Sequence, residues 1–171
     1  MIATLFRSLR KFTEKGRFRD EIHKQLEAFA EGEINDIEGA IVLARTGAAE
    51  AVPYLHKALI FCDVFALCQS EADPKSYVSV RSPGNFRAYV VFTTRARAES
   101  VLNQSRDGVV VEQPFYHVLH AAPVGLGIVI NPMDVAVRLD IDPSDVAGLT
   151  NLMVAEAEGM QARKNQRRNS D

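Results

Sequence analysis

Polar side chains follow two apolar runs of the chain, residues 88–92 and 127–130, at the point where each run ends. If both runs are parallel strands of one sheet, these side chains meet at the same edge of that sheet. The set offers cationic groups, an amide and a soft apolar residue, but no base or nucleophile of adjustable pKa, so it favours recognition of a partner over catalysis. We therefore predict no catalytic residue and a binding edge formed by Thr93, Arg95, Arg97, Asn131 and Met133.

Arginines are frequent on both sides of the first run. If they converge in space, they form a surface for an acidic partner or an anionic ligand. The alternative interpretation is that each of them is solvated separately. The arginines are Arg81, Arg87, Arg95, Arg97 and Arg106.

Two histidines are the nearest approach to a metal site in the sequence. His117 and His120 are spaced i, i+3 and share one face of a short helix, but zinc needs further ligands. Glu112 is the nearest candidate in the sequence, and His56 qualifies only if the fold brings it close. We interpret the pair as two partly exposed histidines and predict no metal.

Two further motifs resemble ligand-binding loops and fail on their context. Gly125 and Gly127 precede a strand, whereas the glycines of a phosphate loop follow one. Asp140, Asp142 and Asp145 lack the glycine and the final glutamate of a calcium loop. The second of these aspartates precedes a proline and fits the N-cap of a helix. The sequence therefore predicts no cofactor.

Charge and hydropathy limit the partners that we expect. Residues 34–158 hold nine basic and fifteen acidic side chains, and an acidic body is a poor surface for nucleic acid. No apolar run reaches the length of about 18 residues that a membrane-spanning helix requires, and the N-terminus lacks the apolar core of a secretion signal. Cys62 and Cys68 are expected to be free thiols, as in a cytoplasmic protein.

The hydrophobic pattern predicts alternating helices and strands, which is typical of a single α/β (or α+β) domain with a mixed sheet of about five strands and covering helices. Asn35 and Glu38 have the spacing of a capping box at the start of a helix, and residues 71–75 form a turn. The predicted helices are 18–31, 35–46, 53–62, 95–102, 114–119 and one that begins at 143. The strand-like runs are 64–67, 77–80, 88–92, 109–111, 127–130 and 136–139.

Composition divides the chain into three parts. Residues 1–33 form a basic N-terminal extension with one amphipathic helix, residues 34–158 hold the α/β domain, and residues 159–171 form a basic disordered tail. The apolar periodicity stops near Met160, which is why the domain is expected to end before the tail.

Five short segments resemble one family, the SseB-like N-terminal domain of bacteria, named for the enhanced-serine-sensitivity protein. The resemblance covers about residues 34–150 and is sharpest at the ends of the two apolar runs. It implies a compact α/β domain in a bacterial cytoplasmic protein, with no established reaction and no agreed catalytic residues. The segments are DIEGA (36–40), PYLHKAL (53–59), YVVFT (89–93), GLGIVINP (125–132) and LDID (139–142).

The chain departs from this family at two positions beside the predicted binding edge. Arg95 and Arg97 stand where the family tends to have acidic residues, and Met133 stands where it tends to have glycine. These differences leave the ligand or partner preference open.

We predict a non-enzymatic protein-binding or regulatory module that binds a protein partner or a second copy of itself. The alternative is a small-molecule-binding protein or enzyme with a pocket at the strand ends, where open α/β sheets place their ligands.

Overall fold

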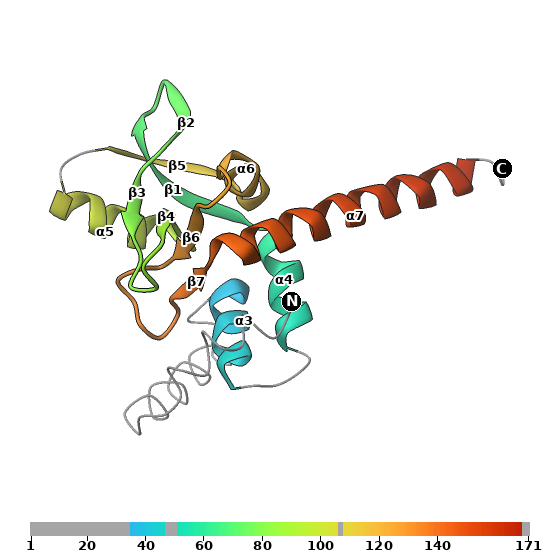
Figure 1. Cartoon of the computed structure of the whole chain (residues 1–171), viewed down its shortest axis with the longest axis horizontal. Coiled ribbons are helices and arrows are strands. Elements are labelled where there is room, and N and C mark those ends of the chain that lie inside the picture. Colours follow the sequence, from blue (N-terminus) through green and yellow to red (C-terminus); the bar gives the residue numbers. More distant parts are fainter. Residues whose placement is uncertain (1–34, 47–50, 106–107, 169–171) are drawn as a thin grey trace.

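The computed structural model describes residues 35–46, 51–105 and 108–168, which form an α/β fold with one mixed sheet of seven strands and five helices (Figure 1). The predicted N-terminal extension and its helix lie outside the described residues. The elements in chain order are α3 (Asp36–Arg45), α4 (Ala51–Phe61), β1 (Asp63–Ser70), β2 (Asp73–Tyr77), β3 (Ser79–Arg81), β4 (Arg87–Phe92), α5 (Arg95–Ser105), β5 (Val109–Pro114), α6 (Phe115–Ala121), β6 (Gly127–Ile130), β7 (Leu139–Ile141) and α7 (Pro143–Arg168).

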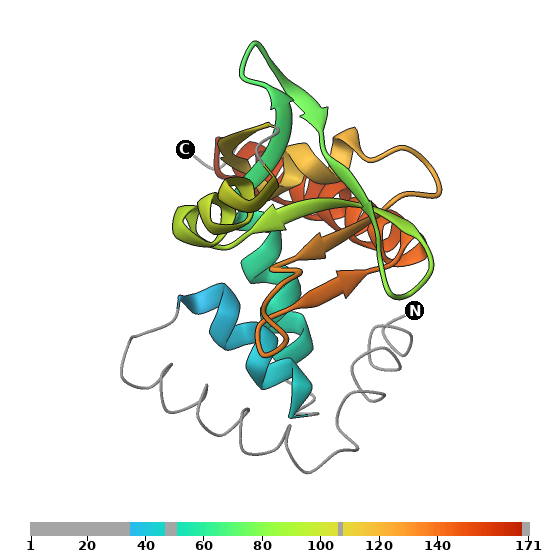
Figure 2. The same ribbon diagram turned by 90° about the vertical axis from the view of Figure 1, so that its left-hand side faces the viewer.

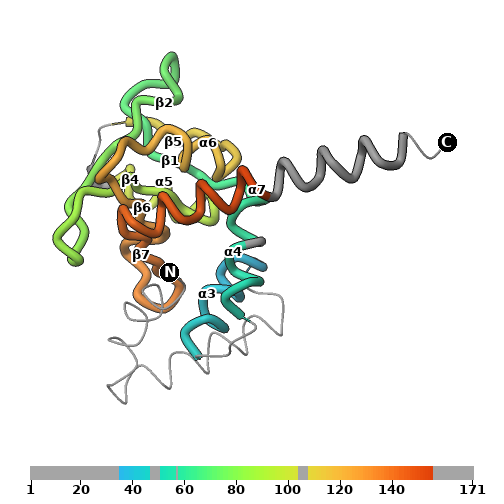
Figure 3. Tube along the Cα trace, turned by 45° about the vertical axis from the view of Figure 1, so that its right-hand side comes forward, coloured from blue at the N-terminus to red at the C-terminus, as the bar shows by residue number. Residues whose placement is uncertain are grey.

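Strand β4 lies at the centre of the sheet. It pairs in parallel with β6 on one side, and antiparallel with β3 and β1 on the other. Strand β5 pairs with β1, and β7 pairs with β6, so these two strands lie toward opposite edges (Figures 1 and 3). The parallel pair confirms the prediction that the two apolar runs end at the same edge of the sheet.

Both faces of the sheet are covered, which explains why its central strands are apolar without alternation. In β4, Tyr89 and Val91 face the larger core, which contains side chains of α3, α4, α6 and α7. Val90 and Phe92 face the smaller core beneath α5. Helix α5 contacts β1, β4 and β5 (Figure 2).

Several predicted elements differ from the structure in their bounds. The predicted strand 77–80 is divided between β2 and β3. Residues 73–75, expected in a turn, belong to β2; Pro74 is tolerated there because β2 lies at an edge of the sheet. The last strand is β7 rather than 136–139, and Ala136 and Val137 are buried in the loop that precedes it. The apolar side chains in this alternating pattern are buried because the loop packs against the protein, and not because the residues form a strand.

Helix α7 begins as predicted and ends much later. The Asp142 side chain accepts hydrogen bonds from the backbone N–H of Ser144 at 2.8 Å and of Asp145 at 2.9 Å, which confirms the predicted N-cap. The helix continues to Arg168, where the sequence predicted a disordered tail from residue 159 (Figure 1). Alanine, glutamine, lysine and arginine are frequent there, and their high helix propensity does not require a buried stripe. No helix in the described part of the chain has the length and apolar character needed to cross a membrane.

Gly127 begins β6 where two other parts of the chain leave no room for a side chain. A Cβ atom at this position would lie 2.5 Å from the carbonyl oxygen of Ile141 and against the ring of Phe86. The substitution Gly127→Ala should therefore lower the free energy of unfolding by about 1–3 kcal/mol, as measured by chemical denaturation. In a Phe86→Ala background the loss should be smaller but not zero, because the carbonyl contact remains. Unchanged stability of the single variant would contradict this packing.

Candidate functional site

The ends of β4 and β6 bring Thr93 and Asn131 together, as the parallel pairing predicts. The backbone N–H of Asn131 donates to the carbonyl of Val91 at 3.0 Å, which extends the parallel ladder by one residue. The backbone N–H of Thr93 then donates to the side-chain Oδ1 of Asn131 at 3.1 Å. Asn131 has a positive φ of 48°, a conformation that asparagine tolerates better than most residues. Both side chains are buried, so they are positioned to hold the sheet edge together.

Glu38 of α3 joins this pair and was not among the predicted site residues. Its backbone N–H donates to Oδ1 of Asn35 at 3.0 Å, which is one half of the predicted capping box. Its carboxylate does not return to the cap. It is 2% exposed and accepts hydrogen bonds from the hydroxyl of Thr93 and from Nε of Arg97. Since the hydroxyl has a single proton, the Thr93 oxygen then accepts from Nδ2 of Asn131, at 3.0 Å.

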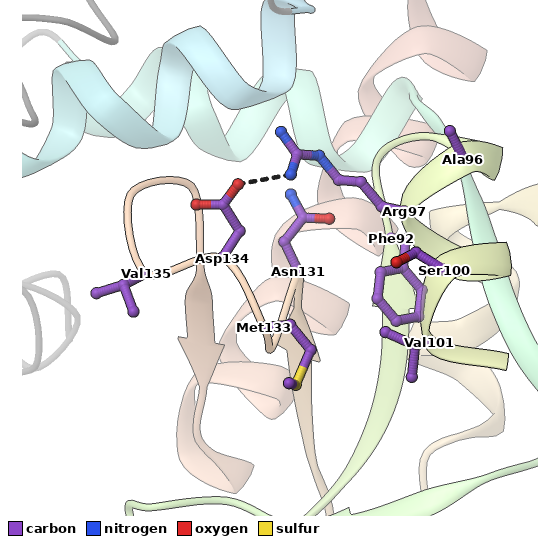
Figure 4. Close-up of a pocket in the computed structure, with 9 residues that line it drawn as sticks. All are labelled: Phe92, Ala96, Arg97, Ser100, Val101, Asn131, Met133, Asp134 and Val135. Carbon is purple, nitrogen blue, oxygen red and sulfur yellow. Dashed lines mark hydrogen bonds and ion pairs between the residues drawn. The ribbon is translucent and has the colours of Figure 1, made fainter. Parts of the chain in front are cut away.

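Arg97 connects α3 to the loop after β6. Its Nε lies 2.8 Å from the Glu38 carboxylate, and its Nη1 lies 2.5 Å from that of Asp134 (Figure 4). Burial alone would lower the pKa of Arg97, but the hydrogen bonds and charges of Glu38 and Asp134 raise it above its ordinary value. The side chain is 30% exposed and held by two carboxylates. The guanidinium of Arg97 therefore has its main partners within the protein.

A second arginine, Arg45 at the end of α3, fixes the same loop. Arg45 is buried and donates hydrogen bonds to the backbone carbonyls of Val135, Ala136 and Arg138. Burial lowers the pKa of Arg45 to about 10, and its Nε has no hydrogen-bond partner among the described residues. Glu38 and Arg45 are seven residues apart and so lie on one side of α3. This side of the helix therefore holds both the strand end and the loop beyond β6.

Arg95 lies apart from the other predicted site residues. Its guanidinium is 3.5 Å from the carboxylate of Glu112 and 5.3 Å from the centre of the Phe65 ring. Residues two apart on a helix point about 200° away from each other, so Arg95 and Arg97 cannot serve the same surface. The structure thus places Arg95 over β1 and β5, away from Asn131 and Met133.

The other arginines do not converge on this edge either. Arg81 and Arg87 are a cross-strand pair of β3 and β4, at the opposite end of β4. Their side chains donate to Asn85 and Ser79 respectively, and Arg106 lies outside the described residues. Within the described part of the chain, the arginines therefore form no single anion-binding surface, and each has its own partners in the protein.

A groove of about 440 Å³ lies between α5 and the loop that follows β6 (Figure 4). Met133 is 70% exposed beside it, and Val135 is 50% exposed farther along the loop. Phe92 and Val101 line the side opposite Met133, and the ion pair of Arg97 with Asp134 closes one end (Figure 4). The remaining lining residues are Ala96, Ser100 and Asn131.

A second hollow, of about 640 Å³, lies on the other side of Thr93, between α3 and α4. Tyr54 and Phe61, both exposed, form its aromatic part. The carboxylates of Asp36 and Asp63 are also among its lining groups. Sequence reasoning did not identify this hollow, because Tyr54 and Phe61 stand in a helix whose other apolar residues belong to the core.

The candidate histidines and the aspartates of the calcium-like motif line neither hollow. His117 and His120 are exposed on α6, and the described residues contain no group of three side chains suited to holding a metal ion. Asp140 pairs with Arg138 at 2.9 Å, while Asp142 caps α7. Cys62 and Cys68 are free thiols.

A comparison of the chain with protein-family models, curated proteins and solved structures finds no match.

The charged network predicts that the two arginines of α5 differ sharply in their effect on stability. Glu38→Gln should lower the free energy of unfolding by about 2–4 kcal/mol, because it leaves a partly buried guanidinium short of one carboxylate. Arg97→Gln should lower the free energy of unfolding by a similar amount. The double variant Glu38→Gln with Arg97→Gln should lower it by less than the sum of the two single effects. Arg95→Gln is the matched control and should cost less than about 1 kcal/mol, since its ion pairs are half exposed. Equal effects of Arg95→Gln and Arg97→Gln would contradict the network.

Proposed function

We propose that this chain is a non-enzymatic protein-binding module of the SseB-like type that acts in the bacterial cytoplasm. The observation that carries the proposal is that the polar side chains at the sheet edge bond mainly to one another. Thr93, Asn131, Glu38, Arg97 and Asp134 form one connected network. What this edge offers a partner is therefore a groove lined by both apolar and polar side chains, beside an exposed methionine, which is a surface typical of protein recognition.

Two further features support the proposal. The two segments in which the SseB-like resemblance is sharpest end at Thr93 and Asn131, which contact each other directly. The free thiols of Cys62 and Cys68 are what a reducing compartment maintains. Burial raises the pKa of these thiols to about 12 and about 11 respectively, which favours a packing role over a nucleophilic one. If the kinship is real, a determined structure of an SseB-like protein should have this sheet order and an equivalent Thr–Asn contact.

Substitutions in the groove should abolish partner binding without unfolding the protein. Met133→Glu introduces a charge at the exposed edge of the groove, and Ser100→Tyr fills the groove without adding charge. Val124→Glu is the matched control, because Val124 is fully exposed and precedes β6 at the other end of the strand. Affinity capture from bacterial lysate with quantitative mass spectrometry should recover the same proteins with wild type and with Val124→Glu. Both groove variants should lose them while keeping the wild-type melting temperature.

Recovery of the same proteins by all variants would contradict binding through the groove.

A second candidate function, small-molecule binding, rests on the hollow between α3 and α4, whose volume lies within the range of ligand pockets. Native mass spectrometry of the purified protein distinguishes the two. A bound small molecule that is lost in Tyr54→Ala and Phe61→Ala, but retained in Met133→Glu, would favour the second candidate.

A further inference from the structure

Strand β5 has a free edge in the described part of the chain. It pairs with β1 over its whole length, from Val109 opposite Cys68 to Pro114 opposite Asp63. No other described strand pairs with it. An unpaired edge presents a row of backbone N–H and C=O groups that can template the addition of another strand.

The hydrogen bonds of β1 establish which backbone groups face β5. The carbonyl of Leu67 accepts from the N–H of Val78 at 2.8 Å, so the backbone of Leu67 faces away from β5. Successive residues of a strand direct their backbone groups to opposite sides, so the groups of Ala66 face β5. The carbonyl of Cys62 accepts from the N–H of Phe115, the residue after β5, at 2.9 Å, and this fits the same alternation.

The alternation of backbone groups along β1 determines which backbone groups of β5 bond to β1 and which point away from it. Val111 lies opposite Ala66, so its N–H and C=O bond to β1. The N–H and C=O groups of Val110 and Glu112 therefore point outward from the sheet. No hydrogen bond to these groups is made within the described part of the chain.

Natural edge strands are usually shielded by lysine, by proline or by a bulge. In β5, the proline stands last, at Pro114, and the strand contains no lysine. Its first three residues are valines, all only partly buried. The outward groups at Val110 and Glu112 thus lie in a stretch with high strand propensity and little shielding.

We propose that the β5 edge is a dimer interface, in which β5 pairs antiparallel with β5 of a second copy of this chain. A two-fold axis at Val111 places Val110 opposite Glu112 of the partner subunit, and each such pair exchanges two backbone hydrogen bonds. This register never places two glutamates directly opposite each other. In this register, the backbone N–H and C=O groups of Val110 and Glu112 that point away from β1 face the same groups of the partner strand.

The charges beside β5 favour a second copy over an unrelated strand. Arg95 and Glu112 are half exposed on the α5 side of the edge, 3.5 Å apart. A two-fold axis brings this pair of opposite charges close to an identical pair in reversed order, so the surface is complementary to itself. An extended segment of another protein would find the same backbone groups, but it would need to supply the matching charges.

The test is the molar mass of the full chain in sedimentation equilibrium over a wide range of concentration. Wild type should approach twice the monomer mass as concentration rises. Val110→Pro removes an outward N–H and should remain monomeric with a folded circular-dichroism spectrum. Val111→Pro is the matched control: it removes an N–H that bonds to β1, so it should lose the cooperative unfolding transition that Val110→Pro keeps.

A second variant and a direct measurement cover the case in which Val110→Pro fails to fold. Glu112→Pro changes an exposed residue with an outward N–H and should also remain monomeric. In wild type, the amide hydrogens of Val110 and Glu112 should exchange more slowly at high than at low protein concentration. A wild-type chain that stays monomeric, folded proline variants that dimerise normally, or exchange independent of concentration would each overturn the proposal. Slower exchange in a monomer with a bound peptide would show that the edge accepts a foreign strand instead.

Discussion

The carboxylate of Glu38 is the charge around which the sheet edge is built. A carboxylate this deeply buried is costly unless hydrogen bonds and an opposite charge compensate it. Thr93 and Arg97 provide both, and each of them belongs to a different element from Glu38. The single carboxylate therefore links α3 to the end of β4, and through Arg97 it reaches the loop after β6.

The same requirement determines where the polar groups of this edge point. Open α/β sheets commonly bind ligands where parallel strands end, and such sites need polar groups directed at the ligand. Here the amide of Asn131 and the guanidinium of Arg97 point toward neighbouring parts of the protein (Figure 4). The network residues Arg97, Asn131 and Asp134 thus line one part of the groove, and Phe92, Val101 and Met133 form its apolar part.

Much of the fold follows from local sequence pattern, whereas the network does not. The unalternating runs at β4 and β6 identified central strands, and the alternation of strands and helices from β4 to β6 indicated that these two strands are parallel. That pairing was enough to bring Thr93 and Asn131 together. Glu38 escaped prediction because its spacing from Asn35 already fits a capping box, and its true partners are 55 and 59 residues away. Arg45 also escaped prediction, because its acceptors are backbone carbonyls 90, 91 and 93 positions farther along the chain.

Helix geometry alone predicts that Arg95 and Arg97 lie on different surfaces. Arg95 and Arg97 are two residues apart in a predicted helix, which directs them to different sides. Sequence alone could not assign which of them faces the carboxylates. The late end of α7 is a different case, because high helix propensity extends an element without leaving a periodic apolar signal.

The account rests on the claim that a partner occupies the groove while the polar network stays closed. Nuclear magnetic resonance spectra recorded during titration with a captured partner test this claim directly. The methyl signals of Met133 and Val101 should shift, while the side-chain amide of Asn131 and the Nε–H of Arg97 keep their positions. Shifts of the Asn131 and Arg97 signals without a change at Met133 would show that the network opens to the ligand, and would contradict the account.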